Sequence, residues 1–235
     1  MINILFCIDK NYKSQCKTVI RSILANTNED VCFHIVGVKN FDCEANIKLY
    51  DTPDASIIKY KNVLNYISHT AVFRLFATKI LDVDKVIYLD SDLIVLDDIK
   101  KLWEIETKYI AGCLDPMAKL HAKRNNLRNN YINSGVLLMN LKNLRKINYF
   151  ERIEATQKGG YNLSLLDQDV INIAFNDIIK LLPVEWNVFS KIYPQSTNDM
   201  IRIRKNPSII HWCGEEKPWN SDVWQKEQWR KYCND

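Results

Sequence analysis

The stretch VIYLDSDLIV, from Val86 to Val95, decides how this sequence is interpreted. It sets two carboxylates, Asp90 and Asp92, inside an apolar run that has the composition of a buried strand. Residues i and i+2 of an extended chain point to the same side, so the two aspartates project together and Ser91 faces away. Two unpaired carboxylates are costly to bury, and a divalent cation bound by both removes that cost.

The motif alone leaves two interpretations open. One is a metal site for magnesium, calcium or manganese, the cations that oxygen ligands suit. The other is a solvated turn at the end of a strand, in which one aspartate caps a following helix. A D-x-D motif is short, so the choice depends on the rest of the chain.

Length and composition fit a globular protein. The 235 residues suit one large domain, and 47% apolar and 26% charged residues are ordinary values. The net charge of +4 is mild and no helix-turn-helix or finger spacing occurs, so no nucleic-acid partner is expected. No run approaches the roughly 20 apolar residues of a membrane span. The opening MINILFCID predicts a first core strand rather than a signal peptide.

The seven cysteines form no CxxC pair, and several lie in apolar, strand-like runs. Cysteine behaves there as a small hydrophobic residue. This pattern favours a reducing compartment over a disulfide framework or a zinc cluster, so a cytoplasmic location is expected.

Two basic segments have alternative interpretations. KLHAKRNNLRNN, from Lys119 to Asn130, is either a solvated loop or a contact for an anionic partner such as a phosphate-bearing acceptor or a membrane surface. The closing WQKEQWRKYCND is aromatic and basic, which is compatible with at most peripheral attachment to a membrane.

Hydrophobic patterns along the chain alternate between strand and helix. They predict strands at residues 2–8, 31–38, 85–90, 109–114, 134–141 and 208–212, and helices at residues 13–27, 44–50, 69–81, 144–158 and 167–177. The second of these helices leads to SIIKYK, residues 56–61. The order implies an α/β fold with a mainly parallel central sheet and helices on both faces. Ligands bind beyond the carboxyl ends of such strands, where Asp9, the two aspartates and His211 fall.

Three further segments have a composition that suits a binding site. HWCGEEKPW offers an imidazole at His211, a glycine that lets backbone approach a ligand, and a lysine suited to phosphate. LDQDVIN opens a helix, where Asp167 or Gln168 either caps the helix or faces a polyhydroxyl ligand. NSGVLL is either a turn or a hydrogen-bonding wall for a sugar.

In their order along the chain, these segments resemble glycosyltransferase family 8, together with IDKNY and the arginine of FRLFA. The resemblance runs from residue 2 to about residue 220 and is nearest to bacterial lipopolysaccharide and lipooligosaccharide galactosyl- and glucosyltransferases, with glycogenin more distant. It implies one GT-A type domain over residues 1–235. The nucleotide-binding half would cover about 1–95, the acceptor and donor-sugar half about 96–220, and a short C-terminal segment 221–235.

The same resemblance implies a metal-dependent, retaining transfer of galactose or glucose from a UDP-sugar to a saccharide acceptor, such as a bacterial surface glycan with a lipid link. Manganese is the expected metal and magnesium the alternative, with ligands Asp90, Asp92 and His211. The nucleotide would lie against Asp9, Asn11, Tyr12, Asp90 and Ser91, the diphosphate against Gly214 and Lys217, and the hexose against Arg74, Asp115, Asn133, Asp167 and Gln168.

Retention leaves the mechanism open. A double displacement needs a carboxylate nucleophile beneath the anomeric carbon. The matching position is Gln168, a poor nucleophile, so the resemblance favours departure and attack on one face of the sugar. Asp167 is then the charged group expected to stabilise an oxocarbenium-like state.

Three rival functions remain from the sequence. Haloacid dehalogenase-type phosphatases also follow a strand with D-x-D, but they place it near the N-terminus and have threonine where this chain has Ile94. A non-catalytic nucleotide-sugar-binding protein would lack turnover, although every expected metal ligand is present. A glycogenin-like enzyme would glucosylate a protein tyrosine.

Overall fold

The computed structural model describes residues 1–58, 69–127 and 130–233. Seven strands form a central sheet in the order β3-β2-β1-β4-β7-β6-β8. Neighbouring strands are parallel except at β7, which is antiparallel to both β4 and β6. The mainly parallel α/β fold expected from the sequence is confirmed. The strands are β1 (Ile2–Cys7), β2 (Val31–Val36), β3 (Ile47–Tyr50), β4 (Val86–Leu89), β6 (Ile110–Leu114), β7 (Ile132–Met139) and β8 (Ile179–Leu181).

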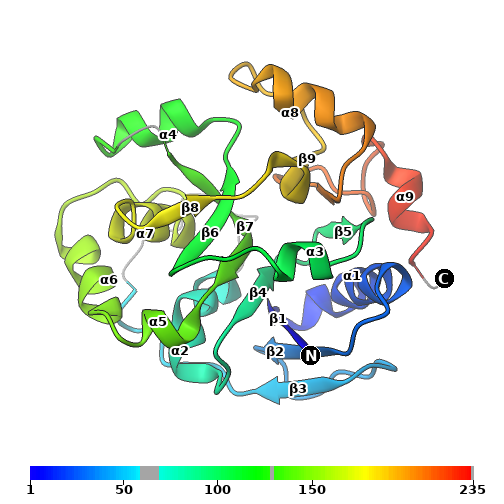
Figure 1. The fold of residues 1–235 in the computed structure, drawn as a ribbon, viewed down its shortest axis with the longest axis horizontal. Coiled ribbons are helices and arrows are strands. Elements are labelled where there is room, and N and C mark those ends of the chain that lie inside the picture. Colours follow the sequence, from blue (N-terminus) through cyan, green and yellow to red (C-terminus); the bar gives the residue numbers. More distant parts are fainter. Residues whose placement is uncertain (59–68, 128–129, 234–235) are drawn as a thin grey trace.

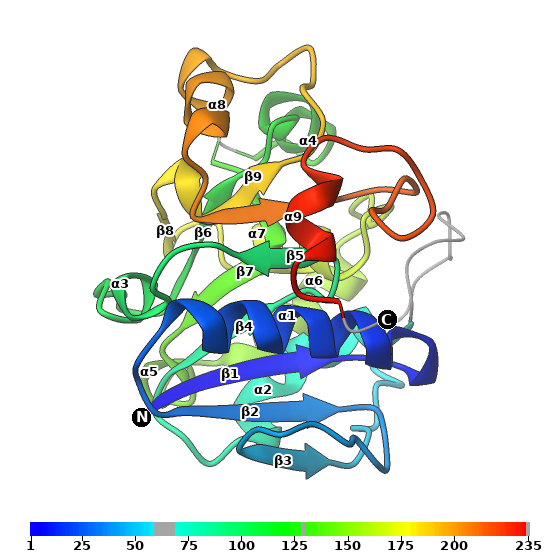
Figure 2. The same ribbon diagram turned by 90° about the vertical axis from the view of Figure 1, so that its right-hand side faces the viewer.

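Both faces of the sheet are buried because successive side chains along each strand point to opposite sides. In β1, Ile4 and Phe6 pack on the side of α1 (Lys13–Asn26), whereas Leu5 and Cys7 pack with the residues of η2 (His69–Phe76). α1 lies across one face, and η2, α2 (Ala77–Ile80), α6 (Tyr149–Lys158) and α7 (Asp167–Ala174) cover the other (Figures 1 and 2).

A second, three-stranded sheet has the order β5-β10-β9. β5 (Leu93–Val95) pairs antiparallel with β10 (Ile209–His211), and β10 pairs parallel with β9 (Val188–Phe189). The apolar residues of β5 and β10 join the same core cluster as α1. The small sheet therefore brings residues 93–95 and the C-terminal part of the chain together beside the large sheet (Figure 2).

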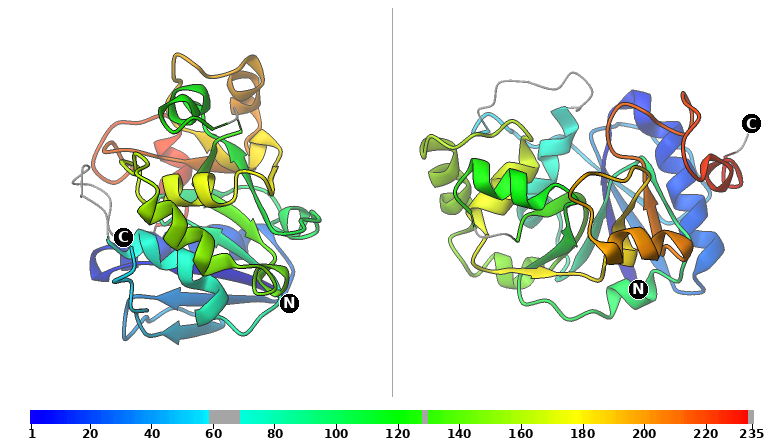
Figure 3. Two further views of the ribbon diagram at one scale, coloured as in Figure 1. Left: turned by 90° about the vertical axis from the view of Figure 1, so that its left-hand side faces the viewer. Right: turned by 90° about the horizontal axis from the view of Figure 1, so that it is seen from above.

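The remaining helices connect these layers. Seen from above, α4 and α8 stand on separate parts of the molecule, while α9 lies near α1 (Figure 3). These elements are η1 (Lys10–Tyr12), α3 (Lys100–Trp103), α4 (Ala118–Arg124), α5 (Leu141–Leu144), η3 (Val184–Asn187), α8 (Asn198–Arg202), η4 (Ile203–Lys205) and α9 (Lys226–Arg230). No helix in the described part of the chain has the length and apolar content needed to cross a bilayer.

Three predicted elements differ from the structure. The helix expected at 44–50 is wrong: residues 47–50 form β3, whose backbone pairs with β2, and so short a helix would gain little on its own. The helix expected at 69–81 is mostly a 3-10 helix followed by four α-helical residues. The helix expected at 144–158 is divided between α5 and α6. Of SIIKYK, residues 59–61 lie outside the described residues.

Candidate active site

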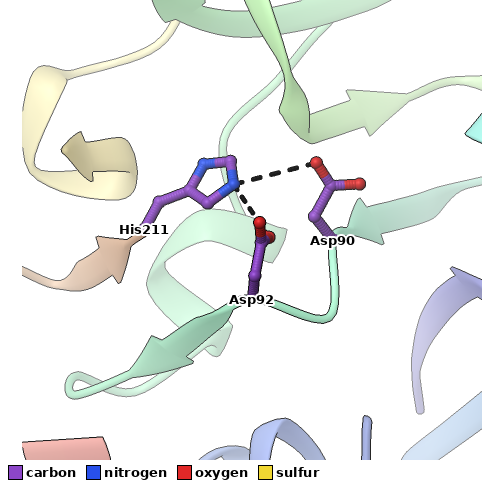
Figure 4. A group of neighbouring side chains, drawn as sticks. All are labelled: Asp90, Asp92 and His211. Atoms are coloured by element: carbon purple, nitrogen blue, oxygen red, sulfur yellow. Dashed lines mark hydrogen bonds and ion pairs between the residues drawn. The ribbon is translucent and has the colours of Figure 1, made fainter. Parts of the chain in front are cut away.

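The paired aspartates lie at the point where the chain leaves the large sheet. β4 ends at Leu89 and β5 begins at Leu93, so VIYLDSDLIV is two strands in different sheets rather than one continuous strand. The bend between them still directs both carboxylates the same way, as expected (Figure 4). Ser91 is buried beside them.

His211 completes a group of three possible metal ligands. The antiparallel pairing of β10 with β5 sets His211 opposite Leu93 and therefore next to the bend. Its Nε2 lies 3.0 Å from Oδ1 of Asp92 and 3.8 Å from Oδ2 of Asp90. One ligand atom from each of the three residues falls within 4.8 Å of the others, so the structure brings the expected trio together (Figure 4).

The surroundings of the trio fit a divalent cation. Two carboxylates and an imidazole are a donor set that suits manganese or magnesium. Gly135 in β7 lies directly beneath: a Cβ there would fall 2.2 Å from Cε1 of His211 and 2.7 Å from Oδ2 of Asp90. The trio therefore requires glycine at this position, which explains a glycine inside a buried strand.

The two carboxylates have different partners. Oδ1 of Asp90 accepts hydrogen bonds from Nη2 of Arg74 at 2.9 Å and from the Tyr88 hydroxyl at 2.6 Å. Asp92 is paired with the Lys217 ammonium and with His211. Burial raises the pKa of Asp92, but Lys217 and His211 outweigh burial and hold that pKa well below its usual range. Asp92 is therefore ionised at neutral pH.

Lys217 lies in a turn whose shape depends on Gly214. Gly214 has φ of +91°, a conformation that side chains rarely adopt. The turn returns the chain so that Nζ of Lys217 contacts Asp92 and donates to the Trp212 carbonyl at 2.7 Å. Lys217 is 7% exposed, so the ammonium is held at the edge of the trio rather than in bulk water.

An open cleft of about 380 Å³ passes over the trio. Every residue expected at the site lines it except Asp9 and Asn11. Asp9 caps η1 and Asn11 lies within it: Oδ1 of Asp9 accepts from the Asn11 amide at 2.8 Å. Further lining residues, which the sequence did not single out, include Tyr88, Met117, His121, Ser134, Phe189, Tyr193 and Cys213.

A wall of amides forms the side of the cleft away from Lys217. Oε1 of Gln168 accepts from Nδ2 of Asn133 at 2.9 Å and from the Ser134 amide at 3.1 Å. Nε2 of Gln168 donates to Oδ2 of Asp115 at 3.2 Å. NSGVLL is therefore part of strand β7, and the turn interpretation is wrong. Its polar residues Asn133 and Ser134 fix Gln168 in the first turn of α7.

Asp167 is a second buried carboxylate of this wall, beside Asp115. Its Oδ2 accepts from the Ser134 hydroxyl at 2.9 Å and pairs with Nε of Arg74 at 3.1 Å. Burial raises the pKa of Asp167, Arg74 opposes this and Asp90 adds to it, which leaves that pKa at about 6. Arg74 thus joins the metal trio to the amide wall, since it contacts both Asp90 and Asp167.

The backbone before Asp167 is strained. Leu166 has φ of +51° and is 2% exposed, and α7 has no side-chain cap, so the capping interpretation of Asp167 and Gln168 is wrong. Asp169 stabilises this turn from below. It is 0% exposed, accepts from the Leu165 amide at 2.6 Å and pairs with Arg124 at 2.7 Å.

The basic segment 119–130 is not simply a solvated loop. Its first part belongs to α4, and Arg124 is engaged with Asp169. His121 turns into the cleft, with Nε2 3.7 Å from Oδ1 of Asp115. Burial lowers the pKa of His121 and raises that of Asp115. Residues 128–129 of this segment lie outside the described residues.

Known proteins are similar to this chain in sequence and in fold. Residues 3–223 match the family model described as Glycosyl transferase family 8. General stress protein A of Bacillus subtilis is 26% identical, over 95% of this chain and 89% of that protein. Glycosyltransferase GlyF of Streptococcus pneumoniae is 29% identical over 93% of this chain, which corresponds to 57% of GlyF.

Solved structures agree on the fold. A galactosyltransferase LgtC in complex with donor and acceptor sugar analogs superposes with a TM-score of 0.83 at 23% identity, over 99% of this chain and 95% of that one. Glycosyltransferase GlyE of Streptococcus pneumoniae gives a TM-score of 0.72 at 24% identity, over 99% and 61%. With a family match over most of its length, the chain belongs to glycosyl transferase family 8 and is a glycosyltransferase.

Proposed function

We propose that this glycosyltransferase moves a hexose, galactose or glucose, from a UDP-sugar to a saccharide acceptor with retention of configuration, and that it requires manganese or magnesium. The observation that carries the proposal is the meeting of Asp90, Asp92 and His211 beside Lys217 at the cleft. A diphosphate needs positive charge around it, which Lys217 and a cation held by the trio would supply. LgtC, whose structure is similar, is itself named a galactosyltransferase.

In this proposal the trio holds the cation, which supplies Lewis-acid stabilisation of the diphosphate when it is bound. Lys217 neutralises charge on the departing diphosphate, and the turn at Gly214 brings backbone close to it. Tyr12 lies in the cleft lining and is proposed to contact the uridine. Asp9, Asn11 and Ser91 stay proposed nucleotide contacts, and Asp90 the contact to the ribose.

The donor hexose would lie against the amide wall. Its hydroxyls face the side chains of Arg74, Asp115, Asn133, Asp167 and Gln168, which are already oriented by one another. Such pre-oriented groups lose little entropy when a sugar binds. The chain would work as one unit, with residues of about 1–95 holding the nucleotide and residues of about 96–220 holding the sugars.

The contacts of Gln168 favour attack and departure on one face of the sugar. Gln168 is a neutral amide whose oxygen and nitrogen are both occupied. Asp169 is fully buried and held by Arg124 and Tyr131. Of the two other carboxylates at the wall, Asp115 accepts from Gln168 and Asp167 is held by Arg74. We assign to Asp167 the stabilisation of an oxocarbenium-like state.

A cytoplasmic location is part of the proposal, because all seven cysteines are free in the structure. The acceptor would be a surface glycan with a lipid link. The α4 helix is proposed as a peripheral contact to the membrane in which such an acceptor lies. The aromatic residues of the C-terminal segment pack on the core instead, with Trp229 2% exposed, so they are not proposed as membrane contacts.

The test is UDP release from a panel of UDP-sugars, with and without manganese and without acceptor. We expect slow, manganese-dependent hydrolysis of one donor, which would identify the hexose. Release from no donor, combined with no thermal stabilisation by UDP plus manganese, would overturn the proposal.

A further inference from the structure

The far nitrogen of the His211 ring has a partner that no sequence motif indicated. Nδ1 of His211 lies 2.8 Å from Oδ1 of Asn187, the last residue of η3. The Sγ of Cys213 is a second neighbour, at 3.1 Å. Asn187 is 6% exposed and His211 1%, so no bulk water competes for these contacts. Whether Nδ1 carries a proton affects whether Nε2 can offer a lone pair beside Asp90 and Asp92.

A chain of hydrogen bonds fixes which way the Asn187 amide points. The backbone amide of Gly135 can only donate, and it donates to Oδ1 of Asn133 at 3.0 Å. That oxygen also accepts from Nδ2 of Asn187 at 2.8 Å. Since Nδ2 of Asn187 is turned to Asn133, its oxygen must face His211. The orientation therefore follows from a backbone group that cannot be reversed.

The other half of Asn133 agrees with this direction. Its Nδ2 donates to Oε1 of Gln168 at 2.9 Å, and the Ser134 amide donates to the same oxygen at 3.1 Å. Reversing Asn133 would set its oxygen against Gln168 and leave Gly135 facing a donor. The amide wall and the metal trio are thus one connected network.

An oxygen at Nδ1 selects one of the two neutral forms of the imidazole. If Nδ1 carries the proton, it donates to Asn187 and Nε2 faces the two aspartates, where it offers its lone pair to a cation and, without a cation, can hold a second proton against Asp92. If Nε2 carries the proton, it donates to Asp92, and Nδ1 accepts from the Cys213 thiol. In that form two lone pairs would face each other across the 2.8 Å to Asn187. The first form is a metal ligand, and the second is not.

We propose that Asn187 is a positioning residue that keeps His211 protonated on Nδ1 and so leaves Nε2 available to a cation. The proposal rests on the metal site of the proposed function, but the proton on Nδ1 follows from the contact with Asn187 and is expected in the protein without metal as well. Partners on the second nitrogen of a ligand histidine typically change metal affinity or activity about 10- to 100-fold.

The first test reads the proton directly. The chain has four histidines, so nitrogen and carbon NMR of histidine-labelled protein, without metal or UDP, gives a small set of ring signals. A His211→Gln variant assigns the signal. We expect a proton on Nδ1 of His211 in the unmodified protein, whether or not Nε2 also carries one beside Asp92. Finding Nδ1 without a proton there would overturn the proposal, whatever the variants do.

The second test replaces the partner. Asn187→Leu should convert His211 to the Nε2–H form and weaken manganese binding without UDP about 10- to 100-fold, measured by paramagnetic resonance of free manganese. Asn187→Asp loses the donor to Asn133 but keeps an oxygen at Nδ1, so it should restore the proton on Nδ1. Asn125→Leu is the matched control, because it removes another buried amide that bonds Asn162 rather than His211. It should cost stability and leave both readouts unchanged.

The outcomes separate the two proposals. Unchanged proton position and unchanged manganese affinity in folded Asn187→Leu would overturn the role of Asn187 and leave the proposed function intact. Equal manganese affinity in the unmodified protein and in His211→Gln would contradict the metal site itself. The NMR measurement of the unmodified protein would still decide the role of Asn187.

Discussion

The metal trio and the amide wall are two halves of one cleft with opposite construction. At the trio, Asp90 and Asp92 keep 26% and 15% of their side chains exposed and are balanced by Arg74 and Lys217. At the wall, Asn133 and Gln168 are buried and bonded to each other. The trio offers charged groups to a charged ligand, whereas the wall offers a fixed pattern of hydrogen-bond donors and acceptors.

This difference tells what each half contributes. Charge that is only partly balanced attracts many kinds of cation and diphosphate. It therefore gives binding energy without much discrimination between ligands. Buried groups in fixed positions penalise a sugar with one hydroxyl in the wrong place, because a buried polar group would then be unpaired. Affinity should therefore depend on the trio, and the choice of hexose on the wall.

Replacing a carboxylate of the trio should have the largest effect. Asp92→Asn removes a charged ligand while its size is kept. We expect manganese-dependent transfer to fall at least about 100-fold, since the cation supplies several kcal/mol to the departing diphosphate. Thermal unfolding serves as the control for folding. Unchanged transfer in the folded variant would remove Asp92 from the metal site.

At the wall, Asp167→Asn should lower kcat by about 10² to 10³, the usual cost of losing one charge placed for the transition state. Because burial raises the pKa of Asp167 to about 6, the carboxylate is lost as the pH falls through 6. The rate should therefore decline as the pH falls, at a pH below 6 when manganese is saturating, because the bound cation offsets the Asp90 charge that helps to raise this pKa. The variant should lack that decline. Asp92 stays ionised there because its pKa is held low.

Replacing the lysine at the edge of the trio should have a smaller effect, which differs between UDP binding and manganese binding. Lys217→Ala should weaken UDP binding about 10- to 100-fold, as expected for one charged hydrogen bond. Manganese binding without UDP should not weaken, because Lys217 and a cation compete for Asp92. Calorimetry measures both affinities. Equal UDP affinity would count against a role at the diphosphate.

The smallest expected change comes from filling the space beneath the trio. A methyl group in Gly135→Ala would meet His211 and Asp90 and should lower manganese affinity about tenfold, with a stability cost of about 1–3 kcal/mol. Gly112→Ala is the matched control: its methyl would press on Ile132 in the apolar core. It should show the stability cost alone in denaturant unfolding. Loss of manganese binding in both variants would show that the effect is not local to the trio.

The sequence predicted much of this arrangement because its signals are local. The alternation of apolar runs predicted the sheet, and the polar residues at strand ends predicted that Asp90, Asp92 and His211 would meet. Residues 44–50 were misinterpreted because an edge strand with a mixed pattern resembles one turn of helix. The sheet change after Leu89 was missed because a continuous apolar run contains no sign of which sheet it joins.

The residues that the sequence did not reveal act through distant contacts. Asn187 lies in VEWNVF, which has no motif, and its importance appears only when β10 brings His211 beside it. Gly135 has a weak signal, a glycine within a buried strand, but its reason lies 76 positions away at His211. His121 was interpreted as part of a basic surface, and only the placement of α4 shows that it faces Asp115.

The most direct test of the central claim is a crystal structure with manganese and UDP, with data collected at a wavelength where manganese scatters anomalously. We expect one strong anomalous peak in contact with Asp90, Asp92 and Nε2 of His211, and Lys217 turned from Asp92 to the diphosphate. A structure with UDP bound in the cleft and no anomalous peak at these three residues would contradict the account.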